Sequence, residues 1–168
     1  MKIILFSDNH RDKEAVLELI KMYPSADRYI SLGDSEMTES ELSMLNIYGV
    51  KGNYPFEPKF PDDLSFTFDD WDFFFTHGHK YGVKNGLSRL YEVSKSLNSE
   101  IVCFGHTHVA FLEEMDDIIF LNPGSLTFPK RFEPTSFAYI ETSPNLIDIK
   151  ILDLKTNKVI FSFKKKKR

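Results

Sequence analysis

Residues 3–10 read IILFSDNH, an apolar run that ends abruptly in a polar turn. The run has the length and continuous apolar character of a buried β-strand. Apolar residues then recur at helical spacing from Val16 to Ile20, behind Asp12, a residue suited to cap a helix. The chain is therefore expected to begin with a strand, a polar loop and a helix.

The pattern of a strand that ends in a polar motif recurs along the chain. The strands expected at residues 28–32 and 47–50 run into Asp34 and Asn53, each preceded by a glycine. In α/β sheets, ligands bind beyond the carboxyl ends of the strands. We therefore expect Asp8, Asp34 and Asn53 to share one rim of the fold.

Strand patterns dominate the second half of the chain. Helices are expected at residues 39–45 and 87–97, and strands at 66–68, 72–76, 101–104, 109–115, 118–121, 136–141, 146–153 and 159–164. This order predicts an α/β protein in which a second sheet packs on the first, with helices outside. Residues 54–63 contain three prolines and are expected to form an ordered surface loop.

The chain shows no repeat, linker or second domain. We expect one domain at residues 1–163, followed by a solvated basic tail, KKKKR, at residues 164–168.

All the histidines of the chain lie in three short motifs. These are Asp8-Asn9-His10, His77-Gly78-His79 and His106-Thr107-His108. Histidines with unrelated structural roles would be scattered, because a satisfied histidine needs no histidine neighbour. Neutral imidazole binds zinc, iron and manganese-type ions, and carboxylates complete such ligand sets. The pattern therefore predicts one metal centre.

Composition limits the other classes of function. The 168 residues carry a net charge of −4, which gives no general attraction to nucleic acid. No apolar run approaches the roughly 18 residues that a membrane span needs, and no signal peptide is evident at the start. A cytoplasmic protein is expected. The single cysteine, Cys103, lies in an apolar run and is expected to be buried and inert.

Taken in order, the motifs resemble those of the calcineurin-like metallophosphoesterase superfamily. Its small YfcE-like phosphodiesterase branch is indicated by the short chain and by Asn122-Pro123-Gly124-Ser125 after Gly105-His106-Thr107-His108. The resemblance implies a four-layer α-β-β-α sandwich of two mixed sheets flanked by helices. It also implies hydrolysis of a phosphoester by in-line attack of a hydroxide that bridges two metal ions.

The resemblance assigns roles to the matching positions. Asp8, His10 and His108 would hold one ion, Asn53, His77 and His106 would hold the other, and Asp34 would bridge both. Two divalent ions are expected, manganese before iron, zinc or nickel, although the donor set itself does not choose among these metals. Relatives often form oligomers, so exposed apolar strands in the second half predict a homodimer or homotetramer.

One position departs from the pattern of many superfamily phosphatases. They carry Gly-Asn-His followed by an acidic residue, whereas this chain has Gly52-Asn53-Tyr54-Pro55. The missing histidine assists the leaving group, and such protonation contributes typically about 10²–10⁴-fold for poor leaving groups. A small-molecule phosphodiester with a better leaving group is therefore the expected substrate.

Further residues are candidates for substrate contact or proton transfer. His79 is expected to act with Asp34 and Asn53 in catalysis, by orienting a neighbouring group, contacting substrate or donating a proton. Arg11, Tyr54 and Arg131 are expected to bind substrate, and Lys130 is a weaker candidate. Ser125 is not expected to be a nucleophile, because activated water removes the need for one.

Two alternatives remain open. A retromer subunit of the same fold has lost key ligands, including the histidine of the D-x-H motif, and acts as a scaffold, but His10 is present here. Some relatives are nucleases, which normally show a cationic surface that follows the phosphates. Outside residues 164–168, the chain has no evident basic stripe.

Overall fold

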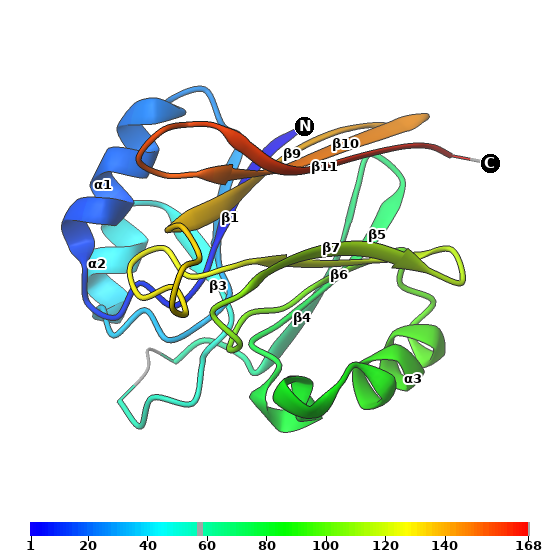
Figure 1. Cartoon of the computed structure of the whole chain (residues 1–168), viewed down its shortest axis with the longest axis horizontal. Helices are drawn as coiled ribbons and strands as arrows, with labels where there is room; N and C mark the ends of the chain where they lie inside the picture. The colour runs from blue at the N-terminus through cyan, green and yellow to red at the C-terminus, as the bar shows by residue number, and fades with distance from the viewer. Residues whose placement is uncertain (57–58, 168) are drawn as a thin grey trace.

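Two β-sheets form the centre of the molecule in the computed structural model, which describes residues 1–56 and 59–167. The first sheet has the order β11-β10-β9-β1-β2-β3 and the second has the order β4-β5-β6-β8-β7 (Figure 1). The strands of the first sheet are β1 (Lys2–Phe6), β2 (Arg28–Ser31), β3 (Ile47–Gly49), β9 (Ser136–Ser143), β10 (Leu146–Asp153) and β11 (Val159–Lys166). Those of the second are β4 (Asp63–Phe68), β5 (Trp71–Thr76), β6 (Ile101–Cys103), β7 (Ala110–Met115) and β8 (Ile118–Pro123).

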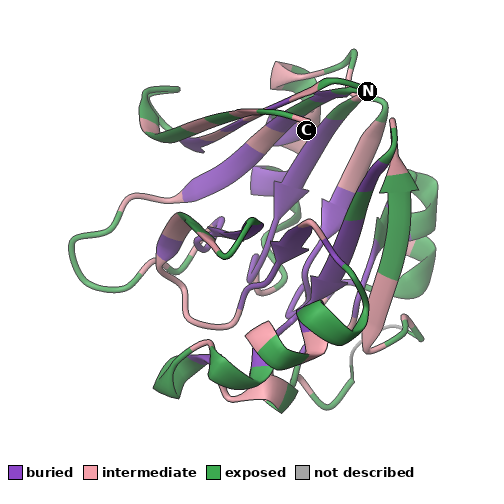
Figure 2. Ribbon diagram, turned by 90° about the vertical axis from the view of Figure 1, so that its right-hand side faces the viewer, coloured by how far each residue is buried: buried purple, intermediate pink, exposed green. Residues whose placement is uncertain are grey.

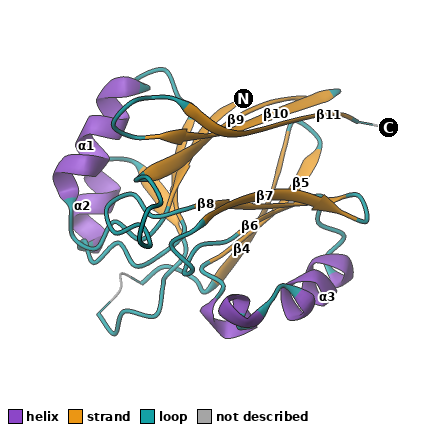
Figure 3. Cartoon of the chain, viewed as in Figure 1, coloured by secondary structure: helices purple, strands orange, loops and turns teal. Residues whose placement is uncertain are grey.

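Helices cover the outer faces of both sheets (Figure 3). They are α1 (Lys13–Met22), α2 (Glu39–Met44) and α3 (Ser88–Ser96), with 3₁₀ turns η1 (His79–Tyr81) and η2 (Val83–Asn85) before α3. The Asp12 side chain accepts a hydrogen bond from the Ala15 N–H, so Asp12 caps α1 as expected. Thr38 and Glu41 form a reciprocal capping box at the start of α2.

Alternation along the central strands produces the layers. In β1, Ile3 and Leu5 belong to the core between the sheets, whereas the residues between and after them pack under α1 and α2. In β5, Phe73 and Phe75 face the core between the sheets and Phe74 packs under α3. Figure 2 shows the resulting buried strands between exposed helix surfaces. The predicted four-layer α-β-β-α sandwich is confirmed.

Parallel pairing brings the polar motifs to one edge. β1, β2 and β3 run parallel in one sheet, and β5, β6 and β8 run parallel in the other. The loops beyond these strands are hydrogen-bonded to one another. The Asp8 N–H donates to the Gly33 carbonyl at 3.1 Å, and the Gly105 N–H donates to the His77 carbonyl at 3.1 Å. The shared rim predicted from the strand ends is therefore present.

The structure does not place the end of the folded chain at residue 163, as the sequence predicted. β11 continues to Lys166 and pairs with β10 as far as the Lys166–Leu146 register. Three lysines of the basic run lie beside acidic groups: Lys164 pairs with Asp148, Lys165 with Glu114 and Lys167 with Glu100. Residues 164–166 belong to an edge strand because their backbone pairs with β10 at the end of the first sheet. Residue 168 and part of the loop expected at 54–63, residues 57–58, lie outside the described residues.

Candidate metal centre

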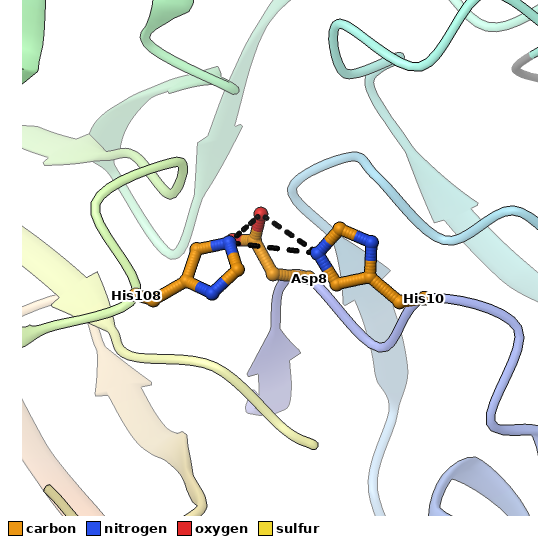
Figure 4. Close-up of side chains that lie close together, drawn as sticks. All are labelled: Asp8, His10 and His108. Atoms are coloured by element: carbon orange, nitrogen blue, oxygen red, sulfur yellow. Dashed lines mark hydrogen bonds and ion pairs between the residues drawn. The ribbon is translucent and has the colours of Figure 1, made fainter. Parts of the chain in front are cut away.

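Two clusters of potential metal ligands lie at the rim. Asp8, His10 and His108 form the first cluster, and Asp34, His77 and His106 form the second. Within each cluster, one ligand atom per residue lies within 4.8 Å of the others. Figure 4 shows the two imidazoles of the first cluster turned toward the Asp8 carboxylate from separate loops. Residues up to 100 positions apart in the sequence therefore meet as the motifs predicted.

Hydrogen bonds to the outer imidazole nitrogens orient three of these histidines. His10 Nδ1 lies 2.8 Å from Glu36 Oε1, His77 Nδ1 lies 2.7 Å from the Leu32 carbonyl, and His108 Nδ1 lies 2.6 Å from the Phe128 carbonyl. These partners only accept hydrogen bonds, so each Nδ1 carries the proton. In a neutral ring the Nε2 lone pair is then unprotonated and directed into the cluster, as in metal-bound histidines.

Among the described residues, the inner atoms of the first cluster lack suitable partners. His10 Nε2 and His108 Nε2 lie 3.5 Å apart, so two lone pairs face each other when both rings are neutral. Asp8 Oδ1 lies 3.1 Å from His108 Nε2, yet it is buried and makes no hydrogen bond of good geometry with the described residues. A cation would satisfy all three atoms, and this donor set therefore fits a divalent metal ion.

The second cluster adjoins the first. His77 Nε2 lies 3.5 Å from Asp34 Oδ2, 3.1 Å from Asn53 Oδ1 and 3.2 Å from His106 Nδ1. The same His77 Nε2 lies 3.9 Å from Asp8 Oδ1, which belongs to the first cluster. Asn53 thus adds an amide oxygen to the second cluster, and the two clusters form one continuous polar centre.

Glycines allow the loops to approach this closely. A Cβ atom on Gly52 would lie 2.0 Å from Asp34 Oδ1, and one on Gly105 would lie 2.1 Å from Ser7 Oγ. Both distances are far shorter than van der Waals contact. Glycine is needed at these positions because the Asp34 and Ser7 side chains occupy the space that a side chain would take.

The segment Asn122-Pro123-Gly124-Ser125 holds these loops in place. Asn122 Nδ2 donates to the Gly105 carbonyl at 3.0 Å, and Ser125 Oγ donates to the Asp8 carbonyl at 2.9 Å. Both side chains are fully buried. The motif therefore supports the ligand loops, and the buried Ser125 hydroxyl is not placed to act as a nucleophile.

Comparison with known proteins shows the family of the chain. Residues 1–145 match the model of the calcineurin-like phosphoesterase superfamily domain. The chain belongs to the calcineurin-like phosphoesterase superfamily.

Individual relatives of this superfamily resemble the chain over nearly its whole length. It is 29% identical over 160 residues to the probable metallophosphoesterase YsnB of Bacillus subtilis, covering 95% of each chain. It superimposes on a predicted phosphoesterase of Streptococcus pneumoniae with a TM-score of 0.87, at 26% identity and over 99% and 97% of the two chains. The Escherichia coli phosphoesterase YfcE matches with a TM-score of 0.75 at 21% identity, over 97% and 98% of the chains.

Neighbouring groups shift the pKa values of several side chains in this phosphoesterase centre. Burial opposes the ionisation of Asp34. The hydrogen bond and the charge of His77, together with the hydrogen bond from the Tyr54 N–H, have the larger effect, and they lower the pKa of Asp34 to about 2. Burial, together with the positive charge of His77 and Lys84, lowers the pKa of His106 to about 4. At neutral pH, Asp34 is therefore a carboxylate and His106 a neutral imidazole, the forms that bind metal ions.

The remaining candidate residues surround the phosphoesterase centre unevenly. The His79 ring centroid lies 5.4 Å from that of His77, and its buried Nδ1 has no hydrogen-bond partner among the described residues. The Arg11 guanidinium donates to the Tyr54 hydroxyl at 3.2 Å, so these two candidates lie together. By contrast, the exposed Arg131 makes no hydrogen bond or ion pair with the clusters in the part of the chain that is described. Lys130 contacts the centre only through its N–H, 3.4 Å from the His108 carbonyl.

Sequence reasoning missed residues that position the ligands. Glu36 accepts the hydrogen bond of His10, Ser7 Oγ donates to Asp8 Oδ2 at 2.6 Å, and the Phe128 carbonyl holds His108. Glu36 follows Asp34 by two positions and Ser7 precedes Asp8, so proximity to a predicted ligand was the one available signal.

Among the described residues, no helix is both long and apolar enough to cross a membrane.

Proposed function

We propose that this chain is a phosphodiesterase that works with two divalent cations. Asp8, His10 and His108 would hold one cation. Asn53, His77 and His106 would hold the other, and Asp34 would be shared between them. The observation that carries the proposal is the pair of inward Nε2 atoms of His10 and His108, 3.5 Å apart beside the buried Asp8 carboxylate. Without a cation, this arrangement of lone pairs and negative charge is unfavourable.

Cations held there would act as Lewis acids toward the phosphoryl group and an attacking water. The protein prepares the centre for this chemistry. Three of the histidines are held in one tautomer by partners outside the clusters, so little reorganisation is needed on binding. Arg11 lies next to His10 and is exposed, which places a guanidinium where a phosphate oxygen can accept its hydrogen bonds.

A preference for diesters follows from residue 54. The Tyr54 N–H donates to Asp34 Oδ1 at 3.0 Å, so this residue lies beside the centre at the position where many superfamily phosphatases carry histidine. A tyrosine there does not supply the imidazole that assists the leaving group in those phosphatases. Small-molecule phosphodiesters with good leaving groups are therefore the proposed substrates, and His79 is the proposed group for proton transfer or substrate contact.

Manganese is the proposed metal. Nitrogen and oxygen ligands without cysteine suit manganese, and they also suit iron, zinc or nickel. A nuclease is less favoured, because Lys165 and Lys167, two of the five cations of the basic run, are already paired with acidic side chains. A scaffold without activity is less favoured because the complete ligand set is assembled.

The test is hydrolysis of bis(4-nitrophenyl) phosphate by metal-free protein to which manganese is added back. Wild type is compared with Asp34→Ala and His106→Ala, and with Glu18→Ala, which removes an exposed carboxylate from α1. We expect manganese-dependent turnover in wild type and Glu18→Ala, and its loss in the two ligand variants. No turnover with manganese, iron, zinc or nickel, despite two ions bound per chain, would support the scaffold instead. Faster cleavage of monoesters than diesters would refute the diester preference.

A further inference from the structure

Phe128 lies against the first cluster. Its ring packs edge-on against the His10 ring with a centroid distance of 5.5 Å, and its carbonyl holds His108. The Phe128 side chain is nevertheless 59% exposed. An exposed phenylalanine adds nothing to the hydrophobic core, so its ring offers apolar surface directly beside the metal ligands.

Tyr54 and Phe56 provide a second aromatic surface beside that of Phe128. The Tyr54 hydroxyl accepts a hydrogen bond from Arg11, while its N–H is fixed by Asp34. Its ring meets the Phe56 ring edge-on at a centroid distance of 5.8 Å, and Phe56 is 81% exposed. Tyr54 is therefore held at both ends, and the two rings form a pair at the rim.

The His10–Arg11 turn contacts both aromatic surfaces. Phe128 contacts His10, and Tyr54 contacts the next residue, Arg11. The Arg11 side chain is 70% exposed, and its guanidinium lies 3.7 Å from the Glu36 carboxylate beside the cluster. Exposed aromatic faces next to a cation and a metal centre have the chemistry to bind a planar ring attached to a phosphate.

Resting on the proposed phosphodiesterase activity, we propose that Phe128, Tyr54 and Phe56 form a subsite for a planar aromatic ring carried by a group that is esterified to the phosphate. Arg11 would contact the phosphate oxygens between that ring and the metal centre. The substrates are then diesters that carry a nucleobase or another flat ring, and simple alkyl diesters would bind more weakly.

The subsite is tested by binding of product-like monoesters rather than by turnover. Isothermal titration calorimetry on manganese-loaded protein compares thymidine 5′-phosphate, phenyl phosphate and methyl phosphate, with bound manganese measured for every variant. In wild type we expect the two ring-bearing ligands to bind about tenfold more tightly than methyl phosphate, as stacking on an aromatic side chain predicts. Tighter binding of thymidine 5′-phosphate would identify a nucleobase as the ring, and tighter binding of phenyl phosphate would identify a simple aryl group.

Matched variants separate stacking from support of the ligands. Phe128→Ala is expected to lower the affinity for the two ring-bearing ligands to that of methyl phosphate, and Phe128→Tyr is expected to restore it. Phe56→Ala gives an independent test if Phe128→Ala loses manganese. Phe132→Ala is the control, because Phe132 is fully exposed nearby in the chain and makes no ring contact within the described residues.

Two results would overturn the subsite. One is equal affinity of wild type for all three ligands. The other is an equal loss for all three in Phe128→Ala, which would mean that Phe128 acts only by holding His10 and His108. Calorimetry measures binding and does not depend on turnover. A failure of the subsite is therefore distinguished from a failure of the phosphodiesterase activity, which is measured by diester hydrolysis.

Discussion

Single hydrogen bonds on the outer side of the metal centre decide how its histidines can act. A neutral imidazole has one proton, and an acceptor at Nδ1 fixes that proton away from the cluster. Backbone carbonyls do this for His77 and His108, while a side chain, Glu36, does it for His10. Glu36 is therefore the outer partner that mutation can remove.

Glu36→Ala is expected to weaken manganese binding about 10–100-fold, the usual cost of losing an outer partner of a metal ligand. The fold should persist, because Glu36 lies at the rim rather than in a core cluster. Manganese titration followed by calorimetry measures the effect, with Glu18→Ala as the control. Unchanged affinity would show that His10 is held by other contacts.

His79 is expected to differ from the neighbouring histidines. It lies beside His77 but belongs to neither ligand cluster. His79→Ala should therefore keep the manganese content of wild type while kcat for the diester falls roughly 10²-fold or more, the size of a lost proton-transfer group. His77→Ala should lose both metal and turnover. If His79→Ala also loses manganese, His79 supports the ligands instead.

At the scale of elements, strand ends bring the ligands together. The strands expected from apolar runs are present with boundaries that differ by a few residues, since each run had the length and flanking polar residues of a strand. The sequence also identified every residue of both clusters, because each stands directly after a strand or in an H-x-H motif. It did not identify Glu36 or the Phe128 carbonyl, because their roles arise only when separate loops touch.

Gly105→Ala tests how closely these loops must pack. The added methyl group would lie 2.1 Å from Ser7 Oγ and 3.1 Å from Asp8 Oδ2, so the first loop has to move. We expect a loss of about 1–3 kcal/mol in the free energy of unfolding, as for other overpacked sites. Manganese affinity should fall as well. Urea unfolding and metal titration measure the two effects, and Glu18→Ala, a substitution at an exposed position of α1, is the comparison.

Across the whole molecule, the basic C-terminal strand ties the two sheets together. Lys165 reaches Glu114 in β7, and Lys167 reaches Glu100 and lies 4.7 Å from the centre of the Trp71 ring. These lysines alternate with the exposed Lys164 and Lys166. Lys165 and Lys167 join the two sheets, whereas Lys164 pairs with Asp148 within its own sheet.

The double variant Lys165→Ala/Lys167→Ala is expected to lower the free energy of unfolding by about 1–2 kcal/mol, from two partly buried ion pairs and one cation–π contact. Lys158→Ala/Lys166→Ala removes the same charge from two exposed lysines and should change stability by less than about 0.5 kcal/mol. Urea unfolding of both variants measures this difference. Equal effects would mean that overall charge, rather than the contacts, matters.

The assembly state stays a prediction at this scale. A homodimer or homotetramer would have two or four times the 19.5 kDa mass of one chain. Light scattering after size-exclusion chromatography measures that mass directly, and a mass of one chain would contradict the expectation.

The sequence by itself determined the sheet layers, the rim and the members of the two clusters of potential metal ligands. These depend on local patterns, namely apolar runs of strand length and polar motifs at their ends. Only the tertiary structure decided which imidazole nitrogens face inward, where the aromatic rings stand and which lysines join the sheets. These features depend on contacts between residues distant in the chain, such as His10 with Phe128 and Lys167 with Trp71, which a local pattern does not specify.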